Sequence, residues 1–303
     1  MVRTIKYTRR ASHEVVIGGY KIGGNNPIAV QSMTNTPTAD IEASVAQTER
    51  IERAGAEIVR LTAQGKKEGE ALQPIMDMLR SHGSKAAIVA DIHFTPEIAM
   101  IAAEAVDKVR INAGNFRTPN GELERLIAIC RRRGVALRIG VNHGSLAKRV
   151  FDIWGDTPEG MVESAMEFVK MCREADFHEV VVTVHAYRLL VEAMARENMT
   201  YPLHLGVTEA GDGIEGRIKS AVGIGSLLAD GIGDTRRVSL TADPENEVPV
   251  GKMLVDYFLD REGEFEVSEE AYARYSPTVF RPRTTAKPII HSEITEEYDI
   301  LDA

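Results

Sequence analysis

Short apolar segments alternate with longer amphipathic segments along most of the chain. Eight short runs are rich in Val, Ile and Leu, which is typical of strands covered on both faces. These runs are Ile28–Ser32, Glu57–Thr62, Ala86–His93, Lys108–Asn112, Ala136–Asn142, Glu179–Val184, Leu203–Thr208 and Arg237–Leu240. The segments that follow them predict helices at Asp40–Ala54, Glu68–Ser81, Pro96–Ala105, Gly121–Arg133, Pro158–Glu174, Ala186–Glu197, Ile218–Ala229 and Val248–Leu259.

Eight alternations of strand and helix are the rhythm of a (β/α)8 barrel. Several predicted helices stop at a glycine, such as Gly55, Gly83 and Gly134, which is a common signal for a helix end. A doubly wound open sheet is the alternative, and it usually has fewer repeats and a glycine-rich loop after its first strand. The segment Met33–Pro37 after the first strand contains no glycine. We therefore predict an α/β fold of the TIM-barrel class.

Two segments lie outside this rhythm. The first, Thr4–Gly24, precedes the barrel and predicts a short N-terminal extension, a hairpin that closes the barrel's bottom. The second follows Asp260, contains three prolines and ends in acidic residues. We expect residues 1–260 to form the barrel, and residues 261–303 to form a C-terminal tail or the beginning of a truncated middle domain.

The net charge of −9 and the pI of about 5.5 argue against general binding to nucleic acid or to an anionic membrane surface. No apolar run approaches the length of a membrane span and no signal peptide is evident, so we expect a cytoplasmic protein. The two cysteines, Cys130 and Cys172, lie in predicted helices without metal-binding spacing. They are expected to be reduced core thiols, and no metal site is predicted.

Side chains alternate between the two faces of a strand, and this parity separates arginines from apolar residues. Four predicted strands carry an arginine that shares its face with a small polar residue: Arg60 with Thr62, Arg110 with Asn112, Arg138 with Asn142, and Arg237 with Ser239. The third strand places Asp91 and His93 on the corresponding face. Because the apolar face must pack against helices, we predict that these polar residues point into the barrel.

Four arginines in one barrel require anionic partners, because a buried unpaired guanidinium costs several kcal/mol. They exceed what Asp91 could neutralise, and arginine matches phosphate oxygens well. Barrel active sites lie at the carboxyl ends of the strands. The sequence therefore predicts a site for a small, strongly anionic substrate. A structural network of arginines with neighbouring acids is the alternative.

Two further residues lie at predicted strand ends and have chemistry suited to catalysis. His143 follows the fifth strand and could exchange protons near neutral pH, although it could equally be an ordinary loop histidine. Glu209 follows the seventh strand and could give or take a proton beside the anion. Its alternative role is that of an acidic residue near a helix N-terminus.

Several blocks together resemble the barrel domain of the 4-hydroxy-3-methylbut-2-enyl diphosphate synthase family. The likeness runs from about Thr4 to Leu259 and rests on the blocks Val30–Thr36, Val59–Thr62, Asp91–Phe94, Val109–Asn115, Arg138–Leu146, Leu203–Gly211, Gly231–Thr235 and Arg237–Leu240. The periodicity by itself indicates only a barrel with an anion site.

The resemblance implies an iron–sulfur oxidoreductase of the non-mevalonate isoprenoid pathway. Such an enzyme opens 2-C-methyl-D-erythritol 2,4-cyclodiphosphate reductively, with a [4Fe-4S] cluster and with electrons from ferredoxin or flavodoxin. It implies that Arg60, Arg110, Arg138, Arg237 and Ser239 hold the diphosphate. Asn112, Asn142 and His143 would line the site, Asp91 and His93 would belong to it, and Glu209 would serve the protonation step.

The sequence departs from that family in two places. The family holds its cluster with three cysteines and a glutamate in a separate C-terminal domain, and this chain carries no such cysteines. The chain alone is therefore expected to be inactive, with the cluster supplied by a longer chain or across a homodimer. At Val184-His185 the family has a Lys-Ala-Ser loop whose lysine helps to bind diphosphate, so we expect residues to be missing or deleted here.

Two other functions stay open from the sequence. One is a barrel transferase similar to dihydropteroate synthase, and the other is a barrel that binds anions without catalysis.

Overall fold

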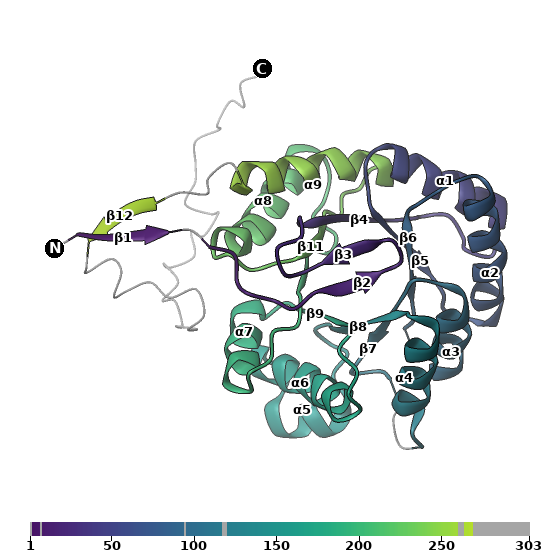
Figure 1. The fold of residues 1–303 in the computed structure, drawn as a ribbon, viewed down its shortest axis with the longest axis horizontal. Coiled ribbons are helices and arrows are strands. Elements are labelled where there is room, and N and C mark those ends of the chain that lie inside the picture. Colours follow the sequence, from purple (N-terminus) through teal and green to yellow (C-terminus); the bar gives the residue numbers. More distant parts are fainter. Residues whose placement is uncertain (1, 7, 94, 117–119, 260–263, 269–303) are drawn as a thin grey trace, which may run out of the picture.

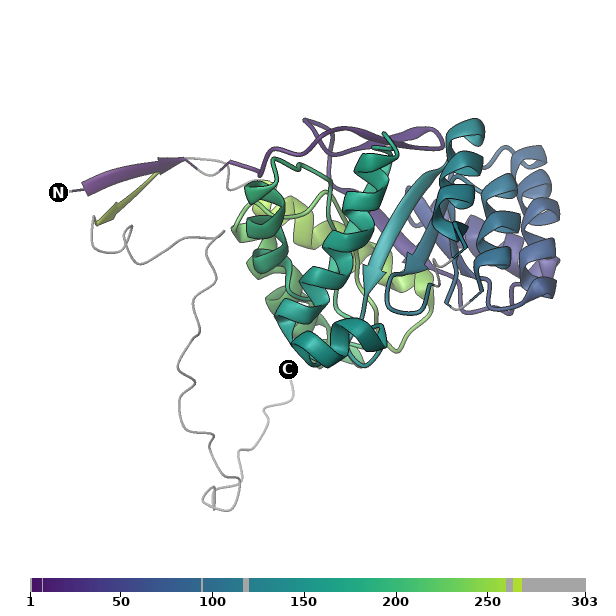
Figure 2. The same cartoon turned by 90° about the horizontal axis from the view of Figure 1, so that it is seen from below.

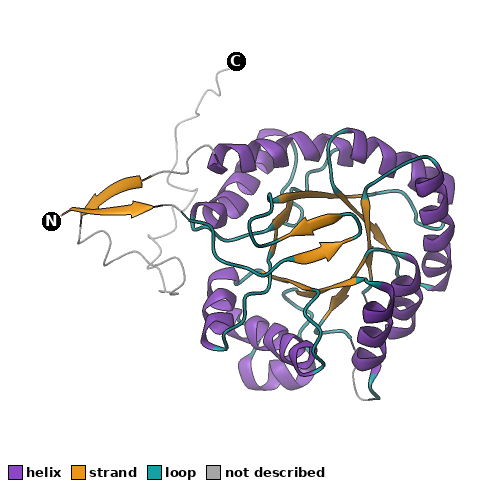
Figure 3. Cartoon of the chain, in the orientation of Figure 1, coloured by secondary structure: helices purple, strands orange, loops and turns teal. Residues whose placement is uncertain are grey.

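The computed structural model describes residues 2–6, 8–93, 95–116, 120–259 and 264–268. Its central feature is a ring of eight parallel strands surrounded by helices (Figures 1 and 3). The strands are β4 (Ala29–Met33), β5 (Ile58–Thr62), β6 (Ala87–Asp91), β7 (Lys108–Asn112), β8 (Ala136–Val141), β9 (Val180–Val184), β10 (His204–Gly206) and β11 (Thr235–Arg237). The fold is a (β/α)8 barrel, as predicted.

The ring closes in sequence order, with β11 paired to both β10 and β4. Between β9 and β10 it closes through a parallel bridge of Val182 and Leu203. The surrounding helices are α1 (Ile41–Arg53), α2 (Lys66–Ser81), α3 (Pro96–Ala105), α4 (Glu122–Arg133), α5 (Lys148–Trp154), α6 (Pro158–Glu174), α7 (Tyr187–Arg196), α8 (Gly213–Ala229) and α9 (Pro244–Leu259). The short helix α5 was not predicted. No helix in the described part of the chain is long and apolar enough to cross a membrane.

Most apolar side chains of the strands point outward and pack against the helices in one core. This arrangement follows from the parity of the sequence: Val59 and Leu61 are fully buried in that core, while Arg60 between them faces the interior of the barrel. The two cysteines, Cys130 on α4 and Cys172 on α6, are buried in the same outer core, as predicted.

A hairpin of β2 (Val15–Ile17) and β3 (Tyr20–Ile22) lies across one end of the barrel (Figure 2). Val15, Ile17 and Ile22 are fully buried there. They pack against a separate interior cluster of inward-facing strand residues, namely Ala29, Ile58, Ala87, Val89, Ala136 and Val181. The expected hairpin at the bottom of the barrel is therefore confirmed.

A second pair of strands lies beside the barrel, where β1 (Val2–Lys6) pairs with β12 (Glu264–Ser268) in antiparallel register (Figure 1). The N-terminal extension thus meets the segment that follows α9. The predicted boundary near residue 260 stays a prediction, and residues 269–303 lie outside the described residues.

Candidate functional site: an arginine cavity at the strand ends

The four arginines converge on a single cavity of about 170 Å³ at the carboxyl ends of the strands, as the parity of the sequence predicted. It is lined by Arg60, Asp91, His93, Arg110, Arg138, Asn142, Thr183, His185, His204, Gly206, Val207, Thr208, Arg237 and Ser239. Below this level lies the apolar cluster capped by the hairpin. The barrel is therefore apolar at its bottom and cationic at its top.

Asp91 is the acid at the centre of this cavity. Its carboxylate accepts a hydrogen bond from Arg110 Nη1 at 3.0 Å, and lies 3.5 Å from Arg60 Nε and 3.9 Å from His93 Nε2. Burial alone would raise the pKa of Asp91, but the charges of Arg60, Arg110, His93 and Arg138 lower it well below its usual range. Asp91 is thus held ionised and cannot act as a proton donor.

A second acid reaches the arginines from outside the ring. Glu247 at the start of α9 lies 3.7 Å from Arg237 Nε, and it accepts hydrogen bonds from Ser32 Oγ and from the backbone N–H of Leu240. Glu247 was not predicted from the sequence as a partner of these arginines. Two carboxylates against four guanidinium groups still leave the cavity with excess positive charge.

Several guanidinium nitrogens of the cavity have no hydrogen-bond partner among the described residues. They are Arg110 Nε, Arg138 Nη1 and Arg237 Nε, and all three are buried. Arg138 Nε donates to Thr183 Oγ1 at 3.0 Å, so its side chain is fixed in place. Burial lowers the pKa of Arg60 to about 10, which leaves it charged at neutral pH. Unpaired buried donors on charged groups are what an anion with several oxygen atoms would satisfy.

Gly140 on β8 gives Arg110 its space. A Cβ atom built at Gly140 would lie 2.8 Å from Arg110 Nε and 3.0 Å from Arg110 Nη2. Its neighbours along the same face of β8 are Arg138 and Asn142, which both line the cavity. The glycine therefore allows three inward positions of one strand to serve one site.

We expect Gly140→Ala to displace the Arg110 guanidinium and weaken anion binding. A charge-assisted hydrogen bond is worth about 1.5–3 kcal/mol, so binding should weaken about tenfold or more. Titration calorimetry with inorganic diphosphate measures the affinity of the wild-type protein and of Gly140→Ala. Gly19→Ala in the β2–β3 turn is the control, because its Cβ would meet nothing within 4 Å. Unchanged affinity in Gly140→Ala would contradict the role assigned to Gly140.

The remaining candidate binding residues divide between the cavity and its surroundings. His93, Asn142 and Ser239 line the cavity. Asn112 does not, although it is buried on the inward face of β7. Its amide nitrogen donates to Ser145 Oγ at 3.1 Å, and its amide oxygen accepts from the N–H of Gly114. The structure therefore gives Asn112 a local role in joining the loops that follow β7 and β8.

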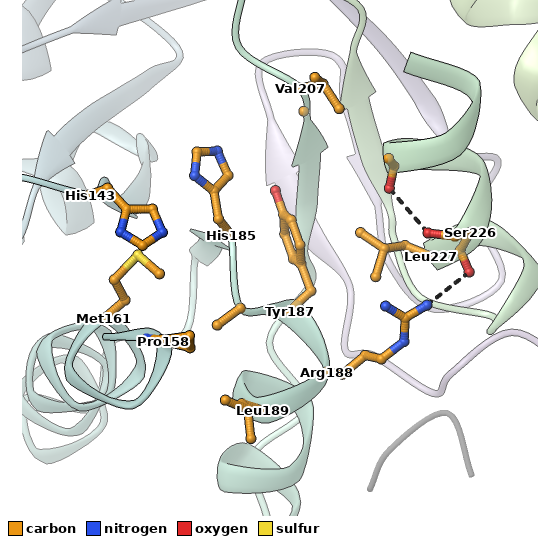
Figure 4. A pocket seen from close by; sticks show the side chains of 13 residues that line it. His143, Pro158, Met161, His185, Tyr187, Arg188, Leu189, Val207, Ser226 and Leu227 are labelled. Atoms are coloured by element: carbon orange, nitrogen blue, oxygen red, sulfur yellow. Dashed lines mark hydrogen bonds between the residues drawn. The ribbon is translucent and has the colours of Figure 1, made fainter. Parts of the chain in front are cut away.

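His143 lies outside the arginine cavity and lines a neighbouring cavity of about 360 Å³. Its ring stacks on that of His185, with 6.3 Å between the ring centroids (Figure 4). Its Nδ1 lies 3.5 Å from Asp156. This second cavity is mostly apolar, with Met161, Leu189 and Leu227 among its walls. The two cavities adjoin, since both are lined by His185, Gly206 and Val207.

Glu209 lies in the β10–α8 loop and is exposed. Its φ of 51° is in the left-handed region, which costs a residue other than glycine about 1 kcal/mol or more. The loop is held near the site, because the N–H of Ala210 donates to the carbonyl of Ser239. Thr208, one residue earlier, lines the cavity, whereas Glu209 does not. Glu209 therefore lies at the mouth of the site rather than inside it.

The sequence reading missed several residues that line the cavity. Thr183 and His185 at the end of β9, and His204 on β10, were not singled out, although the parity rule that selected the arginines applies to them equally. The eighth strand was also placed wrongly, because β11 begins at Thr235 and ends at Arg237. Its Arg236 points outward and donates to the carbonyl of Gly251.

The junction at Val184-His185 is a short, continuous connection. His185 and Ala186 alone join β9 to α7, and both are described. The expectation of an undescribed loop between Val184 and His185 is therefore wrong. A deletion relative to the family stays open.

An iron–sulfur cluster does not fit the described part of this chain. Burial raises the pKa of both Cys130 and Cys172 to about 12, so neither favours the thiolate that a cluster needs. Both lie in the outer core, away from the cavity. The described residues also contain no group of three or more His, Cys, Asp and Glu side chains placed to hold a metal ion.

Comparison with known proteins gives a match over most of the barrel. Residues 12–252 match the family model described as the GcpE TIM-barrel domain. The chain is 52% identical to a protein of Phocaeicola vulgatus over 287 residues, which cover 85% of this chain and 47% of the relative. It is 50% identical to a protein of Leptospira interrogans, covering 83% of this chain and 42% of that relative. Both relatives are named 4-hydroxy-3-methylbut-2-en-1-yl diphosphate synthase (flavodoxin).

The chain thus spans about half the length of the curated relatives it matches. The alignment with a relative of the same name from Porphyromonas gingivalis runs over 313 residues and covers 94% of this chain. That length exceeds the chain's own 303 residues, so the relative carries residues that have no counterpart here. The longer alignment agrees with a deletion in this chain, but it does not show where in the sequence the deletion lies.

Among solved structures, the dihydropteroate synthase of Stenotrophomonas maltophilia superimposes with a TM-score of 0.59. It covers 83% of this chain and 99% of that chain at 13% sequence identity. The dihydropteroate synthase of Yersinia pestis gives a TM-score of 0.54 at the same identity. At this level of identity the likeness shows the barrel fold alone.

Proposed function

This chain belongs to the GcpE TIM-barrel domain family, and we propose on that basis that it is the substrate-binding barrel of a 4-hydroxy-3-methylbut-2-en-1-yl diphosphate synthase. The substrate is then 2-C-methyl-D-erythritol 2,4-cyclodiphosphate, whose ring the enzyme opens reductively. The observation that carries the proposal is the cavity with four arginines, in which Arg110 Nε and Arg138 Nη1 have no partner among the described residues and only Asp91 and the adjacent Glu247 oppose the positive charge. A cyclic diphosphate brings the negative charge and the oxygen acceptors that these groups lack.

In this proposal the arginines bind and orient the substrate. Arg110 and Arg60 are fixed by Asp91, and Arg138 by Thr183, so their free donors are already aimed before the anion arrives. Such preorganisation lowers the cost of ordering side chains on binding. Ser239 and Asn142 at the rim would donate further hydrogen bonds to phosphate oxygens. The apolar cluster under the hairpin closes the lower end of the barrel.

The proton-transfer roles of Glu209 and His143 are also proposals. Glu209 lies at the mouth with a strained backbone, and such strain often marks functional loops. From there its carboxyl group could reach a substrate that protrudes from the cavity. His143 would act from the adjoining cavity, where His185 lies between it and the arginines.

The cluster and the electron donor would come from outside the described barrel. When bound, a [4Fe-4S] cluster would supply the electrons for ring opening, and a longer chain or the second subunit of a homodimer would place it over the strand ends. The names of the relatives support flavodoxin as the donor over ferredoxin. A cytoplasmic location is part of the same proposal.

A dihydropteroate-synthase-like transferase is not favoured. The solved structures of that enzyme share the fold at 13% identity, whereas the relatives that share about half of the sequence carry the synthase name.

Calorimetric titration of the 303-residue chain with the cyclodiphosphate tests the binding proposal. We expect Arg110→Ala to weaken binding about tenfold or more, because it removes a charge-assisted contact worth about 1.5–3 kcal/mol. Arg125→Ala is the matched control, since Arg125 lies on the outer surface of α4 with its side chain 59% exposed. Equal affinity in the wild-type protein and in Arg110→Ala would rule out the cavity as the diphosphate site.

A further inference from the structure

A layer of polar side chains lies inside the barrel, between the apolar floor and the arginines. Lys108 on β7 is the charged member of this layer, and its side chain is fully buried. Its strand neighbours at the same level are Val89 on β6 and Ala136 on β8, which both belong to the floor cluster. Lys108 has no part in the binding roles assigned above.

Lys108 has no acidic partner among the residues that the structure describes. Its Nζ donates to one neutral acceptor, the amide oxygen of Gln31, at the long distance of 3.5 Å. A buried ammonium group without a carboxylate is strongly disfavoured, and proteins commonly resolve this by losing the proton.

The charged groups that face Lys108 from other strands of the barrel make its charged form less favourable still. Arg60 on β5 and Arg138 on β8 are positive, and His204 on β10 is buried and lies near the same arginines. Asp91 on β6 is an acid on this inward face, and it already binds Arg60 and Arg110. From below, the hairpin contributes only apolar side chains to the barrel interior.

Other polar atoms of the layer have no partner among the described residues either. Gln31 Nε2, Thr235 Oγ1 and His204 Nδ1 are buried and unpaired. His204 also lines the arginine cavity, so this layer forms the base of the anion site. In the empty barrel, several buried polar groups of this layer therefore lack hydrogen-bond partners within the described part of the chain.

We propose that Lys108 is neutral in the empty barrel and takes up a proton from solvent when an anion binds to the arginines, so that anion binding is coupled to proton uptake. An anion neutralises Arg60 and Arg138, the two charges that repel a proton on Lys108. Burial, and then the charges of Arg138 and Arg60, lower the pKa of Lys108 well below its usual value, which agrees with this geometry. The proposal rests on the anion site proposed above, and not on the reaction.

Calorimetric titration with sodium sulfate tests the coupling, because sulfate is a dianion that does not itself titrate near neutral pH. Titrations in two buffers with different heats of ionisation, from about pH 7 to about pH 10, give the number of protons exchanged. We expect net proton uptake with the wild-type chain and its loss in Lys108→Met. The control is Lys67→Met, which removes an exposed lysine of α2 and should leave the uptake unchanged.

Thermal unfolding of the free proteins gives an independent second measurement. A lysine that is neutral when folded and charged when unfolded makes the protein less stable as pH falls below the unfolded pKa of about 10.4. Lys108→Met removes this penalty, so its Tm should exceed that of the wild-type protein near pH 7, and the difference should shrink toward pH 10.

Three results would overturn the coupling. They are sulfate binding without proton exchange, proton uptake that persists in Lys108→Met, and a Tm of Lys108→Met at or below that of the wild-type protein throughout the pH range. A wild-type chain that does not bind sulfate at all would overturn the coupling together with the anion site. The failure of the inference alone is therefore distinguishable from the failure of the proposed function.

Discussion

The 303-residue chain should show no reductive turnover of the cyclodiphosphate, even with a strong chemical reductant. Ring opening needs electrons delivered to a carbon–oxygen bond, and amino-acid side chains do not store them. The chain's two cysteines are buried on α4 and α6, their pKa values are raised to about 12, and they lie away from the strand ends. They cannot supply the thiolate ligands of a cluster at the arginine cavity.

The measurement is anaerobic turnover after reconstitution with iron and sulfide, followed by product analysis. The full-length relative from Phocaeicola vulgatus serves as the positive control in the same assay. The purified 303-residue chain should be colourless, without the broad visible absorbance of an iron–sulfur cluster. A brown preparation of this chain that turns over the substrate would refute the view that its barrel only binds substrate.

Asp91→Asn should destabilise the free protein by about 3 kcal/mol, because it leaves the arginines around it without their central counter-charge. Asp91 is almost fully buried and pairs with both Arg60 and Arg110. An anion in the cavity should restore part of this loss, since it replaces the missing charge and stabilises the folded state by mass action. Saturating sulfate should therefore raise the Tm of Asp91→Asn more than that of the wild-type protein.

The stability difference between the wild-type protein and Asp91→Asn should depend on pH. The charges of the arginines lower the folded-state pKa of Asp91 below its unfolded value of about 3.9. Its stabilising contribution is therefore complete above about pH 5, and it is lost as pH falls through the unfolded value toward the lower folded value.

Urea unfolding of the wild-type protein and of Asp91→Asn at several pH values, with and without sulfate, measures the difference in stability. The matched control is Asp77→Asn, on the exposed face of α2, which should change the stability little. A free Asp91→Asn protein as stable as the wild-type protein near neutral pH would show that the cavity does not depend on its central acid.

Much of the fold could be predicted because its signals are local. The strands were placed within a few residues by their apolar runs, and the period of two separated Arg60, Arg110 and Arg138 from the outward-facing core. At the eighth strand the predicted bounds were wrong, but parity still placed Arg237 in the cavity. Arg236 beside it points outward and donates to the carbonyl of Gly251 on α9.

The contacts between distant segments could not be predicted. Glu247 belongs to the helix that directly follows the strand of Arg237, but it is also bound by Ser32 of β4, far away in the sequence, and nothing near either residue indicates that contact. Asn112 followed the same parity as the arginines, yet its amide is occupied by Ser145 and Gly114 of neighbouring loops. Lys108 was treated only as the first residue of a strand, because the groups around it, among them Gln31, Arg60 and Arg138, come from other strands.

The hairpin of β2 and β3 gives the barrel a single entrance. Because Val15, Ile17 and Ile22 seal its lower end, whatever reaches the arginines must enter and leave through the ring of loops above the strands. Any element that rests on those loops therefore controls admission and release together. In many enzymes the opening of such a covering element, and not the chemical step, limits the rate of turnover.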